Sequence, residues 1–153
     1  MENLSLPMSP RLKGKIDEVL KTDGIRLDSD GELRIHYALK KIFPEHKFVK
    51  GSPDFLTCPR TDNKLEYDFF NEELKLAIEY NGIHHYEWPN WTALSLEKFT
   101  EQFLRDQAKY DLSFKNGIYL IVIPYTVPKE LIEENLIARL KNCSVLEKRV
   151  PVV

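Results

Sequence analysis

Leu65-Glu66-Tyr67-Asp68-Phe69-Phe70, followed after a short polar break by Leu74-Lys75-Leu76-Ala77-Ile78-Glu79-Tyr80, is the stretch that decides the fold. Both segments are rich in aromatic and aliphatic residues, so residues 64–70 and 74–80 are predicted to be the strands of a hairpin. Asp68 and Glu79 interrupt this pattern, and acidic residues are poor strand formers that are costly near a core. Each of the two therefore needs a physical reason for its position.

Strand pairing offers such a reason. If Glu72-Glu73 is a two-residue turn, Asp68 lies opposite Ala77 and Glu66 lies opposite Glu79. Asp68 and Glu79 are then diagonal neighbours on one face, about 7–8 Å apart at Cα. Two carboxylates at that separation suit a Mg²⁺ ion, which is held by one or two carboxylates together with water and phosphate oxygens. A three-residue turn would place them on opposite faces, and exposure of both on a solvated face is the open alternative.

The elements around the hairpin predict an α/β domain. A helix is expected to begin at Ser29 with a capping box, in which Ser29 serves the N3 position and Glu32 reaches back, and to end at Pro44. A long helix over 94–115 is expected to bury a stripe formed by Leu96, Phe99, Phe103, Tyr110 and Phe114. Further expected elements are a helix at 11–22, strands at 47–50 and 118–123, and a helix at 128–140. This order predicts a mixed sheet flanked by helices on both faces. The domain is expected to comprise residues 29–142, preceded by an N-terminal arm with a short helix (1–28) and followed by a tail (143–153).

Composition sets the broad class. The chain has 153 residues, of which 42% are hydrophobic and 30% charged, and its formal charge is −2. These values are typical of a globular protein, and the charge counts against nucleic-acid binding without excluding it, because basic residues need only flank an acidic site. No apolar run approaches the roughly 20 residues of a membrane span, and residues 1–4 do not begin a signal peptide, so an intracellular, non-membrane location is expected. Cys58 and Cys143 do not have zinc-finger spacing.

Two adjacent histidines follow the second strand. Asn81-Gly82 indicates a sharp turn that returns His84 and His85 towards the carboxylates. A histidine can take a proton from an attacking water while metal-bound phosphate oxygens carry the developing charge. Core packing or a simple hydrogen bond is the alternative for each, and it is favoured for His84.

These motifs resemble the PD-(D/E)XK restriction-endonuclease-like superfamily, and within it the very short patch repair endonucleases and the EDxHD homing endonucleases. The resemblance runs from about Ser29 to Tyr125. It implies that Asp68 is the principal metal ligand, that Glu79 is a second metal or water contact and that His85 assists proton transfer. It further implies that Glu32 reaches the site from the N-terminal helix and that Asp106 is the last acidic member. For the helix residues, capping by Glu32 and an exposed Asp106–Lys109 ion pair are the alternatives.

One departure bears on activity. The superfamily's usual lysine, two residues after Glu79, is replaced by Asn81. His85 could take over its proton transfer, or Lys109 could supply the missing positive charge. Asn81 therefore also keeps open a rival function, a catalytically inactive nuclease-like domain that acts as a nucleic-acid-binding or assembly module.

The sequence also offers candidate substrate contacts. Arg34, Lys40, Lys41, Lys47 and Lys50 form a locally basic stretch that could follow a phosphate backbone or could simply be a solvated face. Trp88 and Trp91 could stack on bases or cap the sheet. The expected activity is endonucleolytic hydrolysis of phosphodiester bonds with Mg²⁺, or Mn²⁺ in its place. The expected partner is nucleic acid, DNA rather than RNA on the resemblance alone, with a homodimer or a larger assembly supplying specificity. A histidine–carboxylate metal enzyme acting on a small molecule is a third reading.

Overall fold

The structure is a computed structural model that describes residues 29–87 and 95–142, apart from the side chain of His84. The helix predicted at 11–22, both tryptophans and the tail from residue 143 lie outside the described residues. No helix in the described ranges is both long enough and apolar enough to cross a bilayer.

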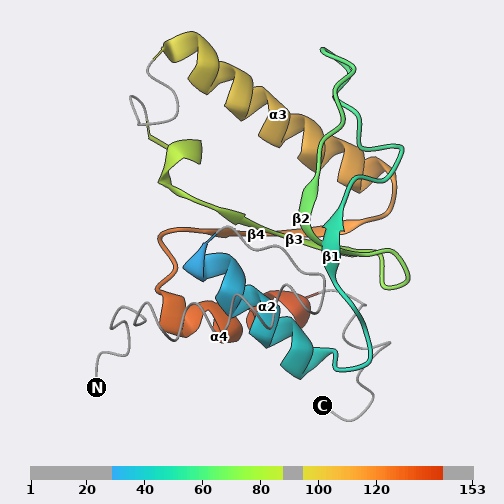
Figure 1. The fold of residues 1–153 in the computed structure, drawn as a ribbon, viewed down its shortest axis with the longest axis vertical. Helices are drawn as coiled ribbons and strands as arrows, with labels where there is room; N and C mark the ends of the chain where they lie inside the picture. The colour runs from blue at the N-terminus through green and yellow to red at the C-terminus, as the bar shows by residue number, and fades with distance from the viewer. Residues whose placement is uncertain (1–28, 88–94, 143–153) are drawn as a thin grey trace.

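A four-stranded mixed sheet forms the centre of the domain (Figure 1). Its strands are β1 (Val49–Gly51), β2 (Tyr67–Asn71), β3 (Leu76–Asn81) and β4 (Tyr119–Pro124), in that spatial order. The β1–β2 and β2–β3 pairs are antiparallel, whereas β3 and β4 are parallel. The parallel pair requires a crossover, and this crossover contains η1 (Ile83–His85) and the long helix α3 (Leu96–Lys115).

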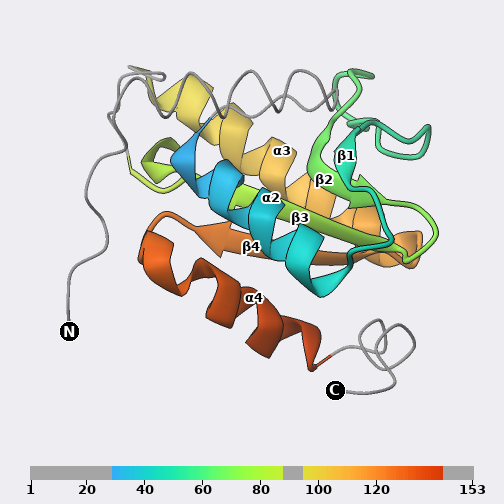
Figure 2. The same ribbon diagram turned by 60° about the horizontal axis from the view of Figure 1, so that its bottom comes forward.

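Helices cover both faces of this sheet, as the sequence predicted. Helix α3 lies on one face, and α2 (Asp30–Ile42) and α4 (Ile132–Leu140), the latter preceded by η2 (Lys129–Leu131), lie together on the other (Figures 1 and 2). Alternation along the strands supplies two apolar clusters, since successive strand residues point to opposite faces. The cluster beneath α2 and α4 includes Phe69, Ile78 and Ile121. The cluster beneath α3 includes Tyr67, Phe70 and Ala77.

The hairpin register differs from the predicted one by two residues. Phe69 pairs with Ile78 and Phe70 with Ala77, so the prediction that Asp68 lies opposite Ala77 is wrong. The reason is a four-residue turn over 72–75 in place of the two-residue turn. The Asn71 side chain accepts a hydrogen bond from the backbone N–H of Leu74 at 2.8 Å, and Lys75 adopts a positive φ of 55°. A change of two residues by itself keeps every side chain on its predicted face. A β-bulge in the pairing of β1 with β2 does interrupt the alternation within β2, so that Tyr67 and Phe69 lie on opposite faces of the sheet.

The predicted buried stripe of α3 is also wrong. Leu96, Phe103, Tyr110 and Phe114 are between 56% and 84% exposed. The helix contacts the sheet through its opposite side, where Ala108 and Leu112 pack on the second cluster and the hydroxyl of Ser113 bonds that of Tyr67. Asp106 and Lys109 lie nearer this side. Because both are polar, a prediction based on hydrophobicity alone assigned the wrong side of the helix to the sheet.

Candidate active site

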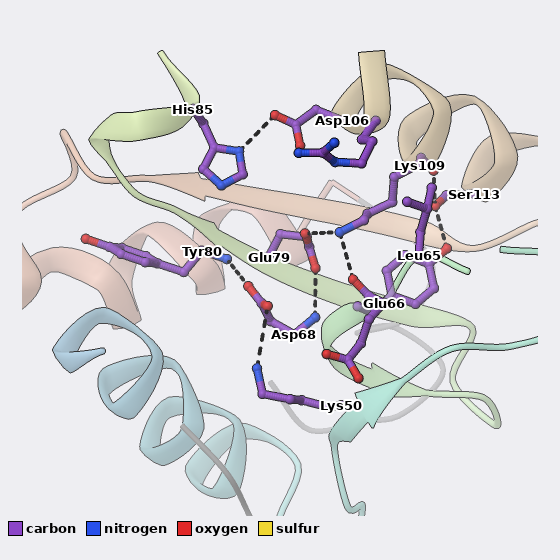
Figure 3. A network of polar contacts seen from close by, with 12 residues as sticks. Lys50, Leu65, Glu66, Asp68, Glu79, Tyr80, His85, Asp106, Lys109 and Ser113 are labelled. Atoms are coloured by element: carbon purple, nitrogen blue, oxygen red, sulfur yellow. Dashed lines mark hydrogen bonds and ion pairs between the residues drawn. The ribbon is translucent and has the colours of Figure 1, made fainter. Parts of the chain in front are cut away.

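The two strand carboxylates meet where the β2–β3 ladder opens (Figure 3). Beyond the Phe69–Ile78 pair, side chains bond to backbone groups across the two strands. The backbone N–H of Asp68 donates to Glu79 Oε2 at 2.7 Å, and the backbone N–H of Tyr80 donates to Asp68 Oδ2 at 2.9 Å. Asp68 and Glu79 therefore converge at this opening through reciprocal bonds across the strands, and not as the predicted diagonal pair.

A β-bulge sets the direction of Asp68. Val49 pairs with Phe70 and Gly51 pairs with Tyr67, so a single residue of β1, Lys50, faces two residues of β2, Asp68 and Phe69. Bulges of this kind bend a strand locally and re-aim its side chains. Phe69 packs beneath α2 and α4, while Tyr67 and Phe70 pack beneath α3. Asp68 is left at the opening of the hairpin, within reach of β1.

Glu79 is buried on the α3 side of this opening. Its side chain is 8% exposed, and its Oε1 lies 2.6 Å from Lys109 Nζ. Lys109 also donates to the backbone carbonyl of Glu66 at 2.7 Å, which ties α3 to the segment leading into β2. Burial raises the pKa of Glu79 to about 7; the Lys109 ammonium opposes this rise and the neighbouring charge of Asp68 adds to it. Lys109 is thus the cation that stabilises the ionised form of Glu79.

Glu32 reaches the same region from the first turn of α2. The helix begins as predicted, with the Ser29 hydroxyl accepting a hydrogen bond from the Glu32 backbone N–H at 3.2 Å. Gly31 lies directly against the Tyr80 ring of β3, where an added Cβ would stand 2.4 Å from the nearest ring carbon. This close approach sets the first turn of α2 onto the sheet, and the buried Glu32 carboxylate lies 3.4 Å from Lys50 Nζ.

A histidine–aspartate pair lies on the α3 side of the site. His85, at the end of η1, has its Nδ1 2.8 Å from Asp106 Oδ2. The second oxygen of Asp106 accepts a hydrogen bond from Gln102 one turn earlier in α3, at 3.0 Å, so the carboxylate is held from two sides. In Figure 3 the labelled side chains form a row from this pair past Glu79 and Asp68 to Lys50. The row follows the sheet from the α3 side to the α2 side.

The residues present fit a divalent ion by the chemistry of their donor atoms. Carboxylate oxygens are the ligands that Mg²⁺ prefers, and it commonly uses one or two of them together with waters. Asp68 lies near Glu79, and Lys50 links it to Glu32. Asp68 with Glu79, or Asp68 with Glu32, would therefore supply two carboxylates. Among the residues described, no three histidine, cysteine or acidic side chains form a ready-made metal cluster. An Mg²⁺ ion held by either pair would complete its coordination with water or substrate oxygens.

The sequence-predicted site residues that the structure describes fall into three groups. Four of them, Asp68, Glu79, His85 and Asp106, lie in this row (Figure 3), and Glu32 joins its end through Lys50. Lys50, predicted as a substrate contact, lies between Glu32 and Asp68, and the β-bulge that brings it there leaves no recognisable mark in the sequence.

The other basic candidates lie away from the acids. Lys41 forms an exposed ion pair with Glu133, and Arg34 is half-buried on α2. Lys40 and Lys47 line a cavity of about 360 Å³ together with His36 and His46, and no acidic residue of the site borders this cavity. Lys40 is two helical turns beyond Glu32, or about 12 Å at 1.5 Å per residue.

The described structure is thus a mixed α/β domain with a polar site at the opening of its central hairpin.

Comparisons with known proteins add viral relatives. The chain is 39% identical over 119 residues to "Uncharacterized protein 033L" of Invertebrate iridescent virus 3, an alignment that covers 78% of this chain and 61% of the relative. It is 40% identical over 85 residues to "Uncharacterized protein 307L" of Invertebrate iridescent virus 6, covering 52% and 43%. It is 35% identical over 101 residues to "Uncharacterized protein 094L" of Frog virus 3, covering 65% and 64%.

The chain spans less than two thirds of the length of each of these relatives. No family profile matches the sequence, and no solved structure matches the chain.

Proposed function

We propose that this domain is a metal-dependent endonuclease of restriction-endonuclease-like fold that hydrolyses phosphodiester bonds, with DNA as its substrate. One observation carries the proposal: Asp68 and Glu79 converge at the open end of the β2–β3 hairpin, with Glu32 linked to Asp68 through Lys50 and the His85–Asp106 pair beside Glu79 (Figure 3). The order of these acids and the histidine along the sequence is the one implied by the resemblance to the EDxHD nucleases: Glu32, Asp68, His85 and Asp106. The preference for DNA rests on that resemblance alone.

His85 is suited to proton transfer in such a reaction. With Nδ1–H donating to Asp106, the basic nitrogen of the neutral ring is Nε2, which can take a proton from an attacking water. Asp106 fixes the ring orientation and stabilises the charged imidazolium, while Gln102 holds Asp106 in place. This pair gives the site a general base that does not depend on the superfamily lysine.

The carboxylates on the other side of the row would hold the metal. Asp68, together with Glu32 or Glu79, would bind Mg²⁺ or Mn²⁺, which when bound polarises a phosphate oxygen and offsets charge in the transition state. Glu79 is tied to the Asp68 backbone N–H and to Lys109, so it also fixes the position of β2 relative to α3. Lys109 supplies a positive charge 2.6 Å from Glu79 Oε1, whereas the sequence has Asn81 in place of the superfamily lysine.

A second function is favoured by a separate observation. Asn81 is buried at 8% exposure, and the ammonium groups of Lys50 and Lys109 already balance charge on the acids. A domain that had lost catalysis could keep these ion pairs as structural contacts and act as a nucleic-acid-binding or assembly module. The two functions differ in one respect that can be measured, which is turnover.

The test is nicking of supercoiled plasmid by the 153-residue chain with Mg²⁺, with Mn²⁺ and with EDTA. The endonuclease predicts relaxed product in either metal and none in EDTA, and loss of product on His85→Ala. Asp54→Asn is the control, because Asp54 is an exposed carboxylate paired with Lys64 on the surface. Binding of DNA without nicking under any of these conditions would favour the module.

A further inference from the structure

Lys50 lies where a cation is expected between two carboxylates of the site. Its Nζ is 3.4 Å from Glu32 Oε1 and 3.8 Å from Asp68 Oδ1. The three residues come from three different elements, namely β1, α2 and β2. Two carboxylates brought this close repel each other unless a positive charge lies between them, and the ammonium supplies that charge.

The local backbone is shaped to bring Lys50 there. Lys50 is the single β1 residue opposite the two-residue bulge of β2. The next residue, Gly51, lies so close to Phe70 that an added Cβ would meet the ring at 3.0 Å and its Cβ at 3.2 Å. β1 is therefore held tightly against β2 immediately beside the lysine.

Burial separates this contact from an ordinary surface ion pair. The Lys50 side chain is 13% exposed, and those of Glu32 and Asp68 are 9% and 23% exposed. By contrast, Lys41 and Glu133 form a pair with side chains 72% and 41% exposed. Solvent screens an exposed pair strongly, and such pairs contribute little. The charge of Lys50 is screened far less, so its presence alters what else can bind to the two carboxylates.

We propose that Lys50 is an internal counter-cation that competes with a divalent metal for Glu32 and Asp68. On metal binding, the ammonium leaves the carboxylates and contacts a phosphate oxygen of the substrate. The flexible four-carbon stem of lysine allows this movement, and the ammonium is a phosphate ligand in its own right. The phosphate contact rests on the proposed function, whereas the competition with metal does not.

This exchange couples metal binding to substrate binding. Without a phosphate nearby, metal binding costs the ammonium its buried partners, so the metal affinity is low. With a phosphate nearby, the ammonium gains a new partner and the metal affinity rises. By thermodynamic linkage, the substrate raises the affinity of the protein for the metal by the same factor as the metal raises its affinity for the substrate.

The test is Mn²⁺ binding to the full 153-residue chain, measured by calorimetry and by the metal-induced rise in Tm. Lys50→Met is expected to bind Mn²⁺ about tenfold more tightly than the wild type, within the usual range of coupling between sites. Its Tm is expected to rise correspondingly more when Mn²⁺ is added. Lys41→Met is the matched control and should leave Mn²⁺ affinity unchanged. Lys50→Gln, which is neutral but polar, gives the same comparison if the methionine variant is unfolded without metal.

Unchanged or weaker Mn²⁺ binding in both Lys50 variants would overturn the proposal, as would failure of Mn²⁺ to restore variants that unfold in EDTA. A second arm repeats the measurement with a DNA duplex in the His85→Ala background, which keeps the duplex intact. The duplex should raise Mn²⁺ affinity when Lys50 is present and should do so much less when it is replaced; an equal rise would refute the phosphate contact. Tighter Mn²⁺ binding in Lys50→Met without plasmid nicking by the wild type would support the competition while rejecting the endonuclease.

Discussion

The Nδ1 atom of His85 lies 2.8 Å from Oδ2 of Asp106, a contact that joins the short helix η1 to the middle of α3. His85 and Asp106 are 21 residues apart in the sequence, and the residues between them include a segment outside the described ranges. The contact gives the imidazole a fixed orientation beside the strand carboxylates. Its contribution to the proposed chemistry can be measured separately from that of the carboxylates.

Replacement of Asp106 by asparagine tests this contribution. Asp106→Asn keeps the shape of the side chain but removes the charge that orients the ring and stabilises the imidazolium. We expect the nicking rate to fall by about 100-fold or more, as for carboxylates that orient catalytic histidines elsewhere. Asp111→Asn is the control, because Asp111 is exposed on the same helix and accepts a hydrogen bond from the Gln107 side chain at 3.3 Å. Equal rates for the two variants would remove Asp106 from the mechanism.

The raised pKa of Glu79 predicts how stability depends on pH. Because the pKa in the folded state is about 7, above the ordinary 4.5, the folded chain holds this proton more tightly than the unfolded chain does. Glu79 therefore lowers the free energy of unfolding as pH rises from about 4.5 to about 7, and its effect is constant above that range. Glu79→Gln should remove this part of the pH dependence in denaturant unfolding measured in EDTA. Glu101→Gln, at an exposed position of α3, should leave it in place; a Glu79→Gln profile parallel to the wild type would contradict the assignment.

Loss of Lys109 is predicted to destabilise the protein in a pH-dependent manner. Lys109→Met leaves the buried Glu79 without its ammonium and the Glu66 carbonyl without its donor. Breaking a buried pair in this way costs about 3–5 kcal/mol when the remaining group stays charged. Below pH 7 Glu79 can instead take up a proton, so the loss should be smaller at pH 5 than at pH 8. The double variant Glu79→Gln/Lys109→Met should recover part of the loss at pH 8, and strict additivity of the two changes would argue against the pair.

Gly31 is predicted to control the approach of α2 to the sheet. Gly31→Ala places a methyl group against the Tyr80 ring, which an undisturbed structure cannot accommodate. We expect a loss of about 1–3 kcal/mol, typical of overpacking, together with reduced nicking because Glu32 moves with the helix. The second change Tyr80→Leu should restore stability by opening the space. If Gly31→Ala alone were neutral in denaturant unfolding, the close contact would be unimportant for the fold.

Much of the fold could be predicted from the sequence because local signals were strong. The Ser29 cap, the end of the long helix at residue 115 and the strand predicted at 118–123 all agree with the structure. The hairpin register could not be predicted, since it depends on the Asn71 side chain bonding within the turn and on the positive φ of Lys75. The orientation of α3 could not be predicted either, because the helix presents Asp106 and Lys109 to the site and leaves large apolar residues exposed.

The candidate site could likewise be predicted where the sequence signal was local, and not where it depended on strand pairing. Asp68 and Glu79 were found because acids inside aromatic strands are costly, and His85 because it follows a sharp turn after the second strand. The role of Lys50 beside these acids was missed, since it depends on a β-bulge that pairs one residue with two. The predicted hairpin was a regular ladder with a two-residue turn. It did not include the hydrogen bonds that the Asp68 and Glu79 side chains accept from the backbone of the opposite strand.

The carboxylates at the hairpin opening are proposed to support metal-dependent cleavage of DNA. The most direct measurement is single-turnover cleavage of an end-labelled DNA duplex by wild-type protein and by Asp68→Asn across a Mg²⁺ titration. We expect saturable, Mg²⁺-dependent cleavage by the wild type. The rate for Asp68→Asn should be at least about 100-fold lower at every Mg²⁺ concentration, the scale of loss found when a preorganised charge-stabilising group is removed. Cleavage by Asp68→Asn at the wild-type rate, or no cleavage by a folded wild-type chain at any Mg²⁺ concentration, would contradict this proposal.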